Sequence, residues 1–301
     1  MNAKQVIKKL SPKSDVDRQD LSCLTYQILH GHPFPFFSDD LSTHVSIQKV
    51  FRLNQNYDLV LLSNEKEHPL SRSTLEKWVN YQWSRHEEGD TCCRYSKNFR
   101  KQIQTSFAIL KHGYVKLWPL MSHIDKLELG QQTKFIAIDG MAASGKTTLA
   151  GILAHLFKGI VVHTDDFYKK ADSNLNDPIA VHGSHIDFDK INQTVIDPLK
   201  RMKDLIYRPF DHQLHRHLEP VMISYRPVVF IEGAYSTHPY MNVTYDYRIW
   251  VKTSYVRAII RIWKRNGIKR LKSFIHRWIP LEQKYKKALH LETQADFILK
   301  T

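Results

Sequence analysis

The feature of this sequence that most restricts its fold is the run Gly-Met-Ala-Ala-Ser-Gly-Lys-Thr at positions 140–147. An apolar segment, residues 135–138, leads directly into it, and Leu149, Ile152 and Leu153 follow it at the spacing of one helix face. The two glycines let a loop wrap around an anion, so that backbone N–H groups and the N-terminus of the next helix face a phosphate. The run therefore predicts a strand, a phosphate-binding loop and a helix, in that order.

The residues of this loop have separate expected roles. Lys146 reaches the β- and γ-phosphates of a nucleotide. The Thr147 hydroxyl coordinates Mg²⁺, which takes few protein ligands and completes its shell with phosphate oxygens and water. A nucleoside triphosphate and Mg²⁺ are therefore expected to bind here, and the resemblance stated below implies ATP. The residues expected to bind ATP are Gly140, Met141, Ala142, Ala143, Ser144, Gly145, Lys146, Thr147 and Thr148.

Strand and helix patterns alternate from residue 134 onward. Strands are predicted at residues 135–138, 160–162, 228–231, 247–251 and 297–299, and helices at residues 146–157, 188–203, 255–264 and 280–288. Such alternation is typical of a parallel sheet with helices on its faces. Together with the loop, it predicts an α/β fold of the P-loop NTPase type, a parallel sheet flanked by helices, over residues 130–301.

Residues 1–129 show a different pattern. Apolar residues recur at helical spacing in residues 21–29, 45–51, 75–83 and 99–109, with one strand candidate at 58–62 and a short helix at 122–129. We therefore expect a mostly helical N-terminal region and a domain boundary near residue 130. Trp78, Tyr81 and Trp83 favour a core or interface stripe over a base-stacking platform. The hypothesis for this region is an accessory unit that packs against the second unit or mediates self-association into a homo-oligomer.

Composition narrows the setting of the protein. The chain is 42% hydrophobic, and its longest apolar runs fall far short of the roughly 20 residues needed to cross a bilayer. The first residues lack the apolar core of a signal peptide. The three cysteines, Cys23, Cys92 and Cys93, have no paired metal spacing and fit a reducing compartment. We expect a cytoplasmic protein with no membrane partner and no zinc site.

The net charge of +14 is unevenly distributed along the chain. Residues 257–287 contain eleven basic residues and a single acid, Glu282. Such a segment is a solvated helical face, a lid over polyphosphate or a nucleic-acid patch. Charge alone leaves these three interpretations open.

Carboxylates follow two of the predicted strands. Asp165 and Asp166 come after residues 160–162, and Glu232 comes directly after residues 228–231. Open α/β sheets hold ligands at the carboxyl ends of their strands. A carboxylate placed there accepts the proton of an attacking hydroxyl or helps to hold a metal, although an aspartate after a strand also commonly caps a turn or helix.

Several segments, in this order, resemble the uridine kinase and phosphoribulokinase group of P-loop small-molecule kinases. The resemblance covers about residues 122–301. Besides the loop with the preceding Ala-Ile-Asp, it rests on Thr-Asp-Asp-Phe-Tyr at 164–168, Ile-Asp-Phe at 186–188 with Pro-Leu at 198–199, Tyr-Arg-Pro-Phe-Asp at 207–211, Ile-Glu-Gly at 231–233, Arg261 and Arg265, Trp-Ile-Pro to Tyr at 278–285, and Ala-Asp-Phe-Ile at 295–298.

This resemblance implies a catalytic role for four residues. Asp165 is similar to the base that takes the proton from the acceptor hydroxyl, with Asp166 the less favoured candidate. Lys146 acts on the transferring phosphate, and Arg261 and Arg265 resemble arginines of a lid that closes on it. The metal ligands implied are Thr147, Glu232 and Asp165. For residues 257–270 the resemblance therefore favours the lid among the three interpretations of the basic segment.

The resemblance also implies an acceptor site. Its expected residues are Tyr168, Asp187, Phe210 and His215, which could hold a pyrimidine and a sugar. Two positions depart from the family pattern: Val181 starts the stretch where the family has an acidic residue before His-Pro, and Asn266 follows the lid arginine where the family has Asp.

The expected function is transfer of the γ-phosphate of ATP to a hydroxyl of a small molecule, with a uridine- or cytidine-like nucleoside as the first candidate. Another metabolite alcohol, pantothenate-like or a sugar phosphate, is the first alternative. An NTPase switch that binds nucleic acid through the basic segment is the second. It is the less favoured one, because the sequence offers no convincing residue to position a hydrolytic water.

Overall fold

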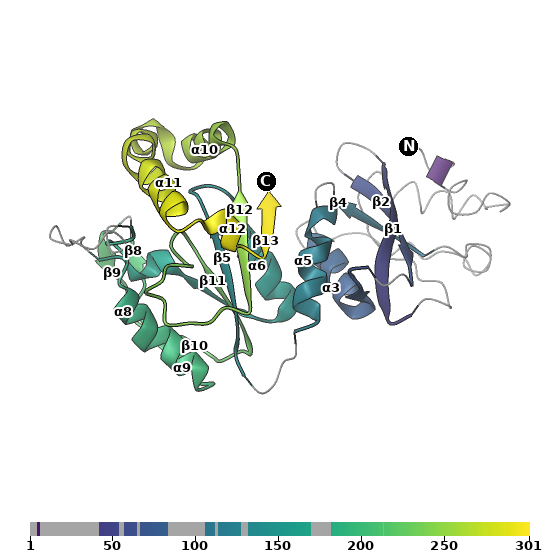
Figure 1. Cartoon of the computed structure of the whole chain (residues 1–301), viewed down its shortest axis with the longest axis horizontal. Helices are drawn as coiled ribbons and strands as arrows, with labels where there is room; N and C mark the ends of the chain where they lie inside the picture. The colour runs from purple at the N-terminus through teal and green to yellow at the C-terminus, as the bar shows by residue number, and fades with distance from the viewer. Residues whose placement is uncertain are drawn as a thin grey trace. The chain divides into compact units, whose positions relative to one another are not determined.

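The computed structural model describes residues 5–6, 42–53, 57–64, 67–83, 106–111, 114–127, 132–169, 182–212 and 214–301. The chain divides into two compact units, Met1–Leu127 and Glu128–Thr301, which are described separately (Figure 1). Among the described residues, no helix is both long and apolar enough to span a bilayer.

A five-stranded parallel sheet forms the centre of the second unit. Its order is β13-β12-β5-β11-β6, and its strands are β5 (Lys134–Gly140), β6 (Ile160–His163), β11 (Val228–Glu232), β12 (Tyr247–Lys252) and β13 (Phe297–Lys300). Each strand contains one of the five predicted segments. β11 is buried along its whole length and β5 from its second residue, as expected for strands covered on both faces. The predicted α/β fold of the P-loop type is confirmed.

Helices follow the strands in the predicted places. They are α6 (Lys146–Phe157), α8 (Phe188–Ile191), α9 (Asp197–Lys200), α10 (Tyr255–Ser273), α11 (Ile279–Ala288) and α12 (Leu291–Gln294). The π-helical segment η3 (Asn192–Ile196) joins α8 to α9, and a second one, η4 (Phe274–Trp278), joins α10 to α11. The helix predicted at 188–203 therefore ends at Lys200. Gly267 interrupts α10 with non-helical backbone angles.

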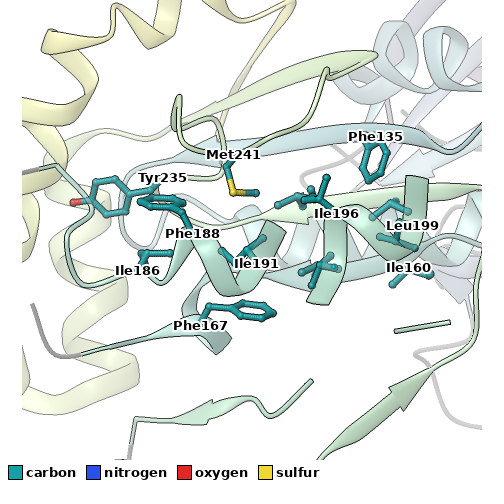
Figure 2. Close-up of a cluster of buried hydrophobic side chains, with 14 of the residues drawn as sticks. Phe135, Ile160, Phe167, Ile186, Phe188, Ile191, Ile196, Leu199, Tyr235 and Met241 are labelled. Carbon is teal, nitrogen blue, oxygen red and sulfur yellow. The ribbon is translucent and has the colours of Figure 1, made fainter. Parts of the chain in front are cut away.

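One large apolar core lies between the sheet and the helix formed by α8, η3 and α9. Phe188, Ile191, Ile196 and Leu199 point from this helix toward the sheet (Figure 2). Beyond the helix, two short antiparallel pairs form: β7 (Leu205–Tyr207) with β10 (Val221–Ile223), and β8 (Phe210–Asp211) with β9 (Arg216–His217).

The first unit contains a four-stranded antiparallel sheet in the order β3-β1-β2-β4. Its strands are β1 (His44–Arg52), β2 (Tyr57–Ser63), β3 (Leu70–Ser71) and β4 (Phe107–Lys111). The described helices are α3 (Arg72–Trp83), the 3-10 turn η1 (Val115–Leu117) and α5 (Trp118–Asp125). Trp78 is fully buried and contacts the Trp118 ring at 6.0 Å, so this tryptophan is a core residue.

The prediction of a mostly helical N-terminal region is therefore wrong for the described residues. The strand at 58–62 and the helix at 75–83 are confirmed, but residues 45–51 lie in β1 and the described end of 99–109 lies in β4. A register shift between Ile47 and Lys49 breaks the alternation of β1, which leaves its apolar residues at a spacing that imitates a helix. The helix expected at 122–129 starts earlier, at Trp118, and ends at Asp125. The segment 21–29 lies outside the described residues.

Candidate active site

The predicted phosphate loop connects β5 to α6. Gly140 adopts φ +152°, and a Cβ atom there would lie 2.4 Å from the Val251 carbonyl oxygen, so the start of the loop requires glycine. Gly145, at φ +103°, precedes the first residue of α6. The Lys146 ammonium donates to the carbonyl oxygens of Gly140 and Met141 over 2.7 and 3.0 Å. Lys146 therefore folds back over the loop that would surround a phosphate.

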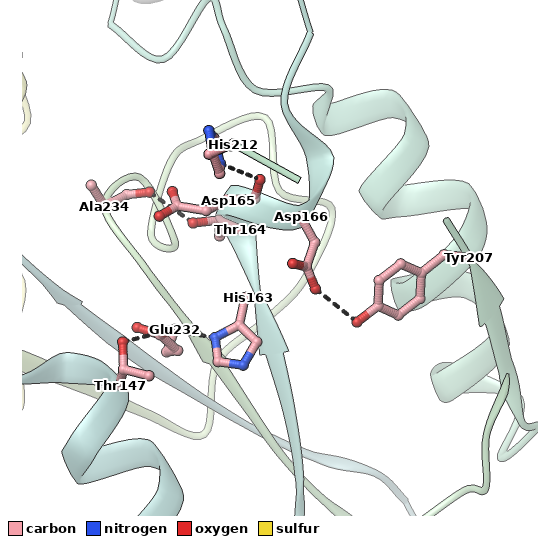
Figure 3. A network of polar contacts seen from close by, with 9 residues as sticks. All are labelled: Thr147, His163, Thr164, Asp165, Asp166, Tyr207, His212, Glu232 and Ala234. Atoms are coloured by element: carbon pink, nitrogen blue, oxygen red, sulfur yellow. Dashed lines mark hydrogen bonds and ion pairs between the residues drawn. The ribbon is translucent and has the colours of Figure 1, made fainter. Parts of the chain in front are cut away.

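A hydroxyl and a carboxylate meet beside this loop. The Thr147 hydroxyl, in the first turn of α6, donates to Oε1 of Glu232 over 3.0 Å. Glu232 is buried at the end of β11, and His163 Nδ1 lies 2.5 Å from the same oxygen (Figure 3). The hydrogen bond to Glu232 raises the pKa of His163. His163 was missed from the sequence, because only the pairing of β6 with β11 places it opposite Glu232.

The oxygen donors here fit Mg²⁺. A threonine hydroxyl and a glutamate carboxylate are hard ligands, and Mg²⁺ needs only one or two of them beside phosphate oxygens and water. No group of three or more His, Cys, Asp or Glu residues with the geometry of a metal site occurs in the described part of the chain. The predicted ligands Thr147 and Glu232 lie together. Asp165 lies in the turn after β6, two residues after His163, the strand residue that pairs with Glu232.

The two aspartates after β6 differ in their surroundings. Both lie in the 3-10 turn η2 (Thr164–Phe167). Asp166 is half-buried and accepts a hydrogen bond of 3.0 Å from the Tyr207 hydroxyl, and burial raises its pKa. The Asp165 side chain is exposed, and its carboxylate has no hydrogen-bond partner among the described residues. Of the two aspartates, Asp165 is therefore the one whose carboxylate is exposed and unpaired among the described residues.

Glycine also fixes the contact between β11 and this turn. Gly233 adopts φ +138°, and a Cβ atom there would lie 1.9 Å from Thr164 Oγ1. The Thr164 hydroxyl donates to the Ala234 carbonyl oxygen over 3.0 Å, as Figure 3 shows. This close approach holds the turn that carries Asp165 against the end of the strand that carries Glu232.

A buried carboxylate anchors the start of the loop. Asp139, in β5, accepts hydrogen bonds from the Gly140 N–H, the Thr237 hydroxyl and the Tyr285 hydroxyl, over 2.7, 2.7 and 3.0 Å. Burial raises the pKa of Asp139. Asp139 was part of the sequence pattern but was not among the predicted site residues. Its contacts with Thr237 and Tyr285 could not be found from local sequence.

Aromatic rings gather around Tyr168, the residue that follows η2. The Tyr168 ring lies 5.0 Å from Phe210 and 5.2 Å from His212. His185 lies 5.7 Å from Tyr168 and 5.1 Å from Trp278, measured between ring centres. Burial lowers the pKa of His185 to about 4, so this ring is neutral near pH 7. We call these five residues the aromatic cluster.

The other two predicted acceptor residues lie differently. Asp187 caps the N-terminus of α8, because its Oδ1 accepts the Lys190 N–H over 3.1 Å. His215 is exposed at φ +52° and makes none of the ring contacts found among the described residues. His212 makes such contacts instead, with Tyr168 and Phe210. Three members of the cluster, His212, His185 and Trp278, were not among the predicted site residues. Val181 lies outside the described residues.

The two predicted lid arginines have different contacts. The Arg261 guanidinium donates to the carbonyl oxygens of Ala143 and Ser144 over 3.1 and 3.3 Å, and to Thr301 Oγ1 over 3.2 Å. It therefore holds the phosphate loop from outside. Arg265 is exposed and donates to the neighbouring Asn266 side chain over 2.8 Å.

Sequence comparison supports the resemblance stated above. No family model matches the chain. Over 135 residues the chain is 29% identical to uridine-cytidine kinase D of Dictyostelium discoideum. This stretch is 42% of the chain and 26% of the relative, so the chain matches only a minor part of that protein's length. The predicted resemblance to the uridine kinase group is confirmed.

Two solved structures are similar at low identity. A possible uridine kinase from Bacillus stearothermophilus aligns over 60% of this chain and 95% of its own, with 20% identity and a TM-score of 0.47. A proposed fructose transport system kinase from a Silicibacter species aligns over 58% and 94%, with 20% identity and a TM-score of 0.46. The fold assignment rests on the parallel strand order and the phosphate loop of this chain itself.

Proposed function

We propose that this chain is an ATP-dependent kinase that transfers the γ-phosphate of ATP to a hydroxyl of a small molecule. The observation that carries the proposal is the meeting of Thr147, Glu232 and the turn of Asp165 at the carboxyl edge of the sheet, beside the phosphate loop. Phosphoryl transfer needs a phosphate cradle, a metal site and a group that accepts the acceptor's proton, and this edge supplies candidates for each.

Each residue has a defined part in the proposed reaction. The amides of the loop and Lys146 bind and orient the phosphates. Thr147 and Glu232 hold Mg²⁺, which neutralises charge on the phosphate oxygens when bound. The Asp165 carboxylate accepts the proton of the attacking hydroxyl. Arg265, exposed on α10 and held only through its neighbour Asn266 among the described residues, turns toward the transferring group and stabilises its equatorial charge.

The aromatic cluster supports a nucleoside with a pyrimidine base, uridine- or cytidine-like, as the acceptor. Tyr168 follows the turn that holds Asp165, and its ring lies 5.0 Å from that of Phe210; aromatic rings favour stacking with a planar base. The neutral His185 ring has one N–H donor and one acceptor nitrogen and carries no charge. A pantothenate-like alcohol or a sugar phosphate would use this aromatic surface less well.

The nucleic-acid switch has less support. Arg261, one of the eleven basic residues of that segment, is engaged with the carbonyl oxygens of the phosphate loop. A cation used in this way is not available to a nucleic-acid backbone. Nucleic-acid binding that weakens steeply with salt would favour the switch.

The test is ATP consumption by the purified protein with Mg²⁺ and a panel of uridine, cytidine, other nucleosides, pantothenate and sugar phosphates. We expect ADP release that depends on a pyrimidine nucleoside and yields its phosphorylated product. Lys146→Ala is the control and should abolish transfer. Slow hydrolysis that no acceptor accelerates would contradict the kinase assignment.

A further inference from the structure

Glu282 is a buried carboxylate that the proposed reaction does not use. It lies on α11, is 8% exposed, and its Oε2 accepts the backbone N–H of Ala142 over 2.7 Å. Ala142 is the third residue of the phosphate loop, 140 positions away in the sequence. Burial of a carboxyl group costs free energy of desolvation, so a buried glutamate that contacts the phosphate loop is expected to have a role there.

The arm formed by α10, η4 and α11 packs against the same loop residue. The Ala142 side chain belongs to a small buried cluster with Ile262, Leu271 and Ile279. Ile262 precedes the break of α10 at Gly267, and Leu271 and Ile279 follow it. Residues from both halves of the arm therefore share one buried cluster with Ala142. The hydrogen bond from its amide to Glu282 fixes the direction in which this residue faces.

The electrostatic surroundings connect Glu282 to the phosphate site. Burial raises the pKa of Glu282 to about 7, while Lys146 and the Ala142 N–H act in the opposite direction. Asp165 and Asp139 add to the rise, and the charge of Glu282 raises the pKa of Tyr235, although burial is the larger cause there. We assign Lys146 to the phosphates, Asp165 to the acceptor and Asp139 to the start of the loop. Glu282 therefore interacts electrostatically with three charged groups of the proposed site.

We propose that Glu282 is a positioning residue for nucleotide binding, which sets the phosphate loop against the arm that carries Arg261 and Arg265. Because the Ala142 amide is already paired, phosphate oxygens are left to the amides of the later loop residues. The inference rests on the proposed function, since it concerns how the nucleotide site is shaped. In this role residue 282 needs a side chain as long as glutamate, with an oxygen atom that accepts the Ala142 N–H, and it does not need a negative charge.

Two substitutions separate reach from charge. E282Q keeps the length and an oxygen that accepts the Ala142 N–H, but removes the charge. E282D keeps the charge but withdraws the carboxylate by one methylene, which leaves the amide unpaired. E292D is the matched control. Glu292 lies on α12, outside the site, and pairs with Lys252 of β12 and Lys286 of α11.

The experiment measures the Kd of a fluorescent ATP analogue with Mg²⁺ for the full chain, without an acceptor, and follows folding by thermal unfolding. We expect E282D to bind about tenfold more weakly than the wild type, as the loss of a buried hydrogen bond predicts. E282Q is expected to stay within about threefold of the wild type and so to rescue the site, and E292D to bind as the wild type does. If E282D does not fold, E282N, short and uncharged, replaces it in the same comparison.

The outcomes are distinct. Wild-type affinity in E282D would overturn the inference, and so would an equal loss in folded E282Q and E282D, because glutamine keeps the acceptor. A wild-type protein that binds no nucleotide would overturn the proposed function, and this inference with it. Binding by the wild type together with either of the first two results would overturn the role of Glu282 alone.

Discussion

The Thr147 hydroxyl donates to Glu232 Oε1 over 3.0 Å and so joins the first turn of α6 to the end of β11. These residues are 85 positions apart in the sequence, and each was expected on the metal side of the site for a separate reason. Their contact brings a hydroxyl and a carboxylate together beside the phosphate loop. A substitution of Glu232 should therefore change, before anything else, the Mg²⁺ concentration that phosphoryl transfer needs.

Glu232→Gln should raise the Mg²⁺ concentration needed for half-maximal transfer by about tenfold, the effect of losing roughly 1.4 kcal/mol of metal binding. Glutamine keeps the size of the side chain and can accept the Thr147 hydrogen bond, so the loop should keep its shape. A Mg²⁺ titration at saturating ATP and acceptor measures this. Glu292→Gln is the control, and superimposable Mg²⁺ curves for Glu232→Gln and wild type would refute the assignment.

Asp165→Asn and Asp166→Asn should differ in turnover. If Asp165 is the base, its replacement should lower kcat by about 10² to 10⁴ while ATP binding stays intact. Asp166→Asn should have a smaller effect, because asparagine can still accept the Tyr207 hydroxyl. Steady-state kinetics with the preferred acceptor distinguishes the two. The reverse ranking would transfer the role of base to Asp166.

The strands of the second unit could be predicted because each is a short apolar run buried between helices, a pattern that local sequence carries by itself. The first unit could not be predicted in the same way. The irregular register between Ile47 and Lys49 removed the two-residue period from β1, so its apolar residues were assigned to a helix. Self-association through residues 1–129 and a cytoplasmic location stay predictions.

The site residues that could be predicted are those that lie close to one another in the sequence. The phosphate loop and the Asp165 turn follow their strands directly, so motif spacing was sufficient. Asp139 contacts Tyr285 and Ala142 contacts Glu282, and both partners lie on α11, 146 and 140 positions away, so no local pattern indicates that these segments meet. The resemblance implied His215, but the ring that lies against Tyr168 is that of His212, and a family resemblance does not decide which histidine of the β8–β9 hairpin makes this contact.

Arg261→Ala and Arg265→Ala should affect different kinetic constants. Arg261 donates to two carbonyl oxygens of the phosphate loop, so its loss should weaken ATP binding about tenfold. Arg265→Ala should leave ATP affinity nearly unchanged and lower kcat by about 10²-fold, as expected when a donor to the transition state is removed. Nucleotide Kd and kcat measured on the same preparations test this. A matching loss of affinity in both variants would remove the distinction.

Gly233→Ala should destabilise the protein by several kcal/mol, since backbone strain at a non-glycine residue with positive φ alone costs about 1–3 kcal/mol. The added Cβ would also lie 1.9 Å from Thr164 Oγ1, which forces β11 and η2 apart. Gly151→Ala is the control, because that glycine lies in α6 with open space around it, and alanine there should stabilise by up to about 1 kcal/mol. Urea unfolding compares the two. Equal stability of Gly233→Ala and wild type would show that this contact does not constrain the turn.

The titration of Glu282 should appear in the pH dependence of stability. Burial raises the pKa of Glu282 from 4.5 to about 7, so between these values the folded chain holds a proton that the unfolded chain has lost. The free energy of unfolding should therefore fall as pH rises from about 4.5 to 7, by an amount on the order of 3 kcal/mol from this group. E282Q does not titrate at this position, so its stability relative to the wild type should increase through the same window and level off above pH 7. Urea unfolding of both proteins at pH 5, 6, 7 and 8 measures the difference, in which the titrations common to both cancel. A difference that stays constant over this range would mean that Glu282 is ionised throughout, held in that state by Lys146 and the Ala142 amide.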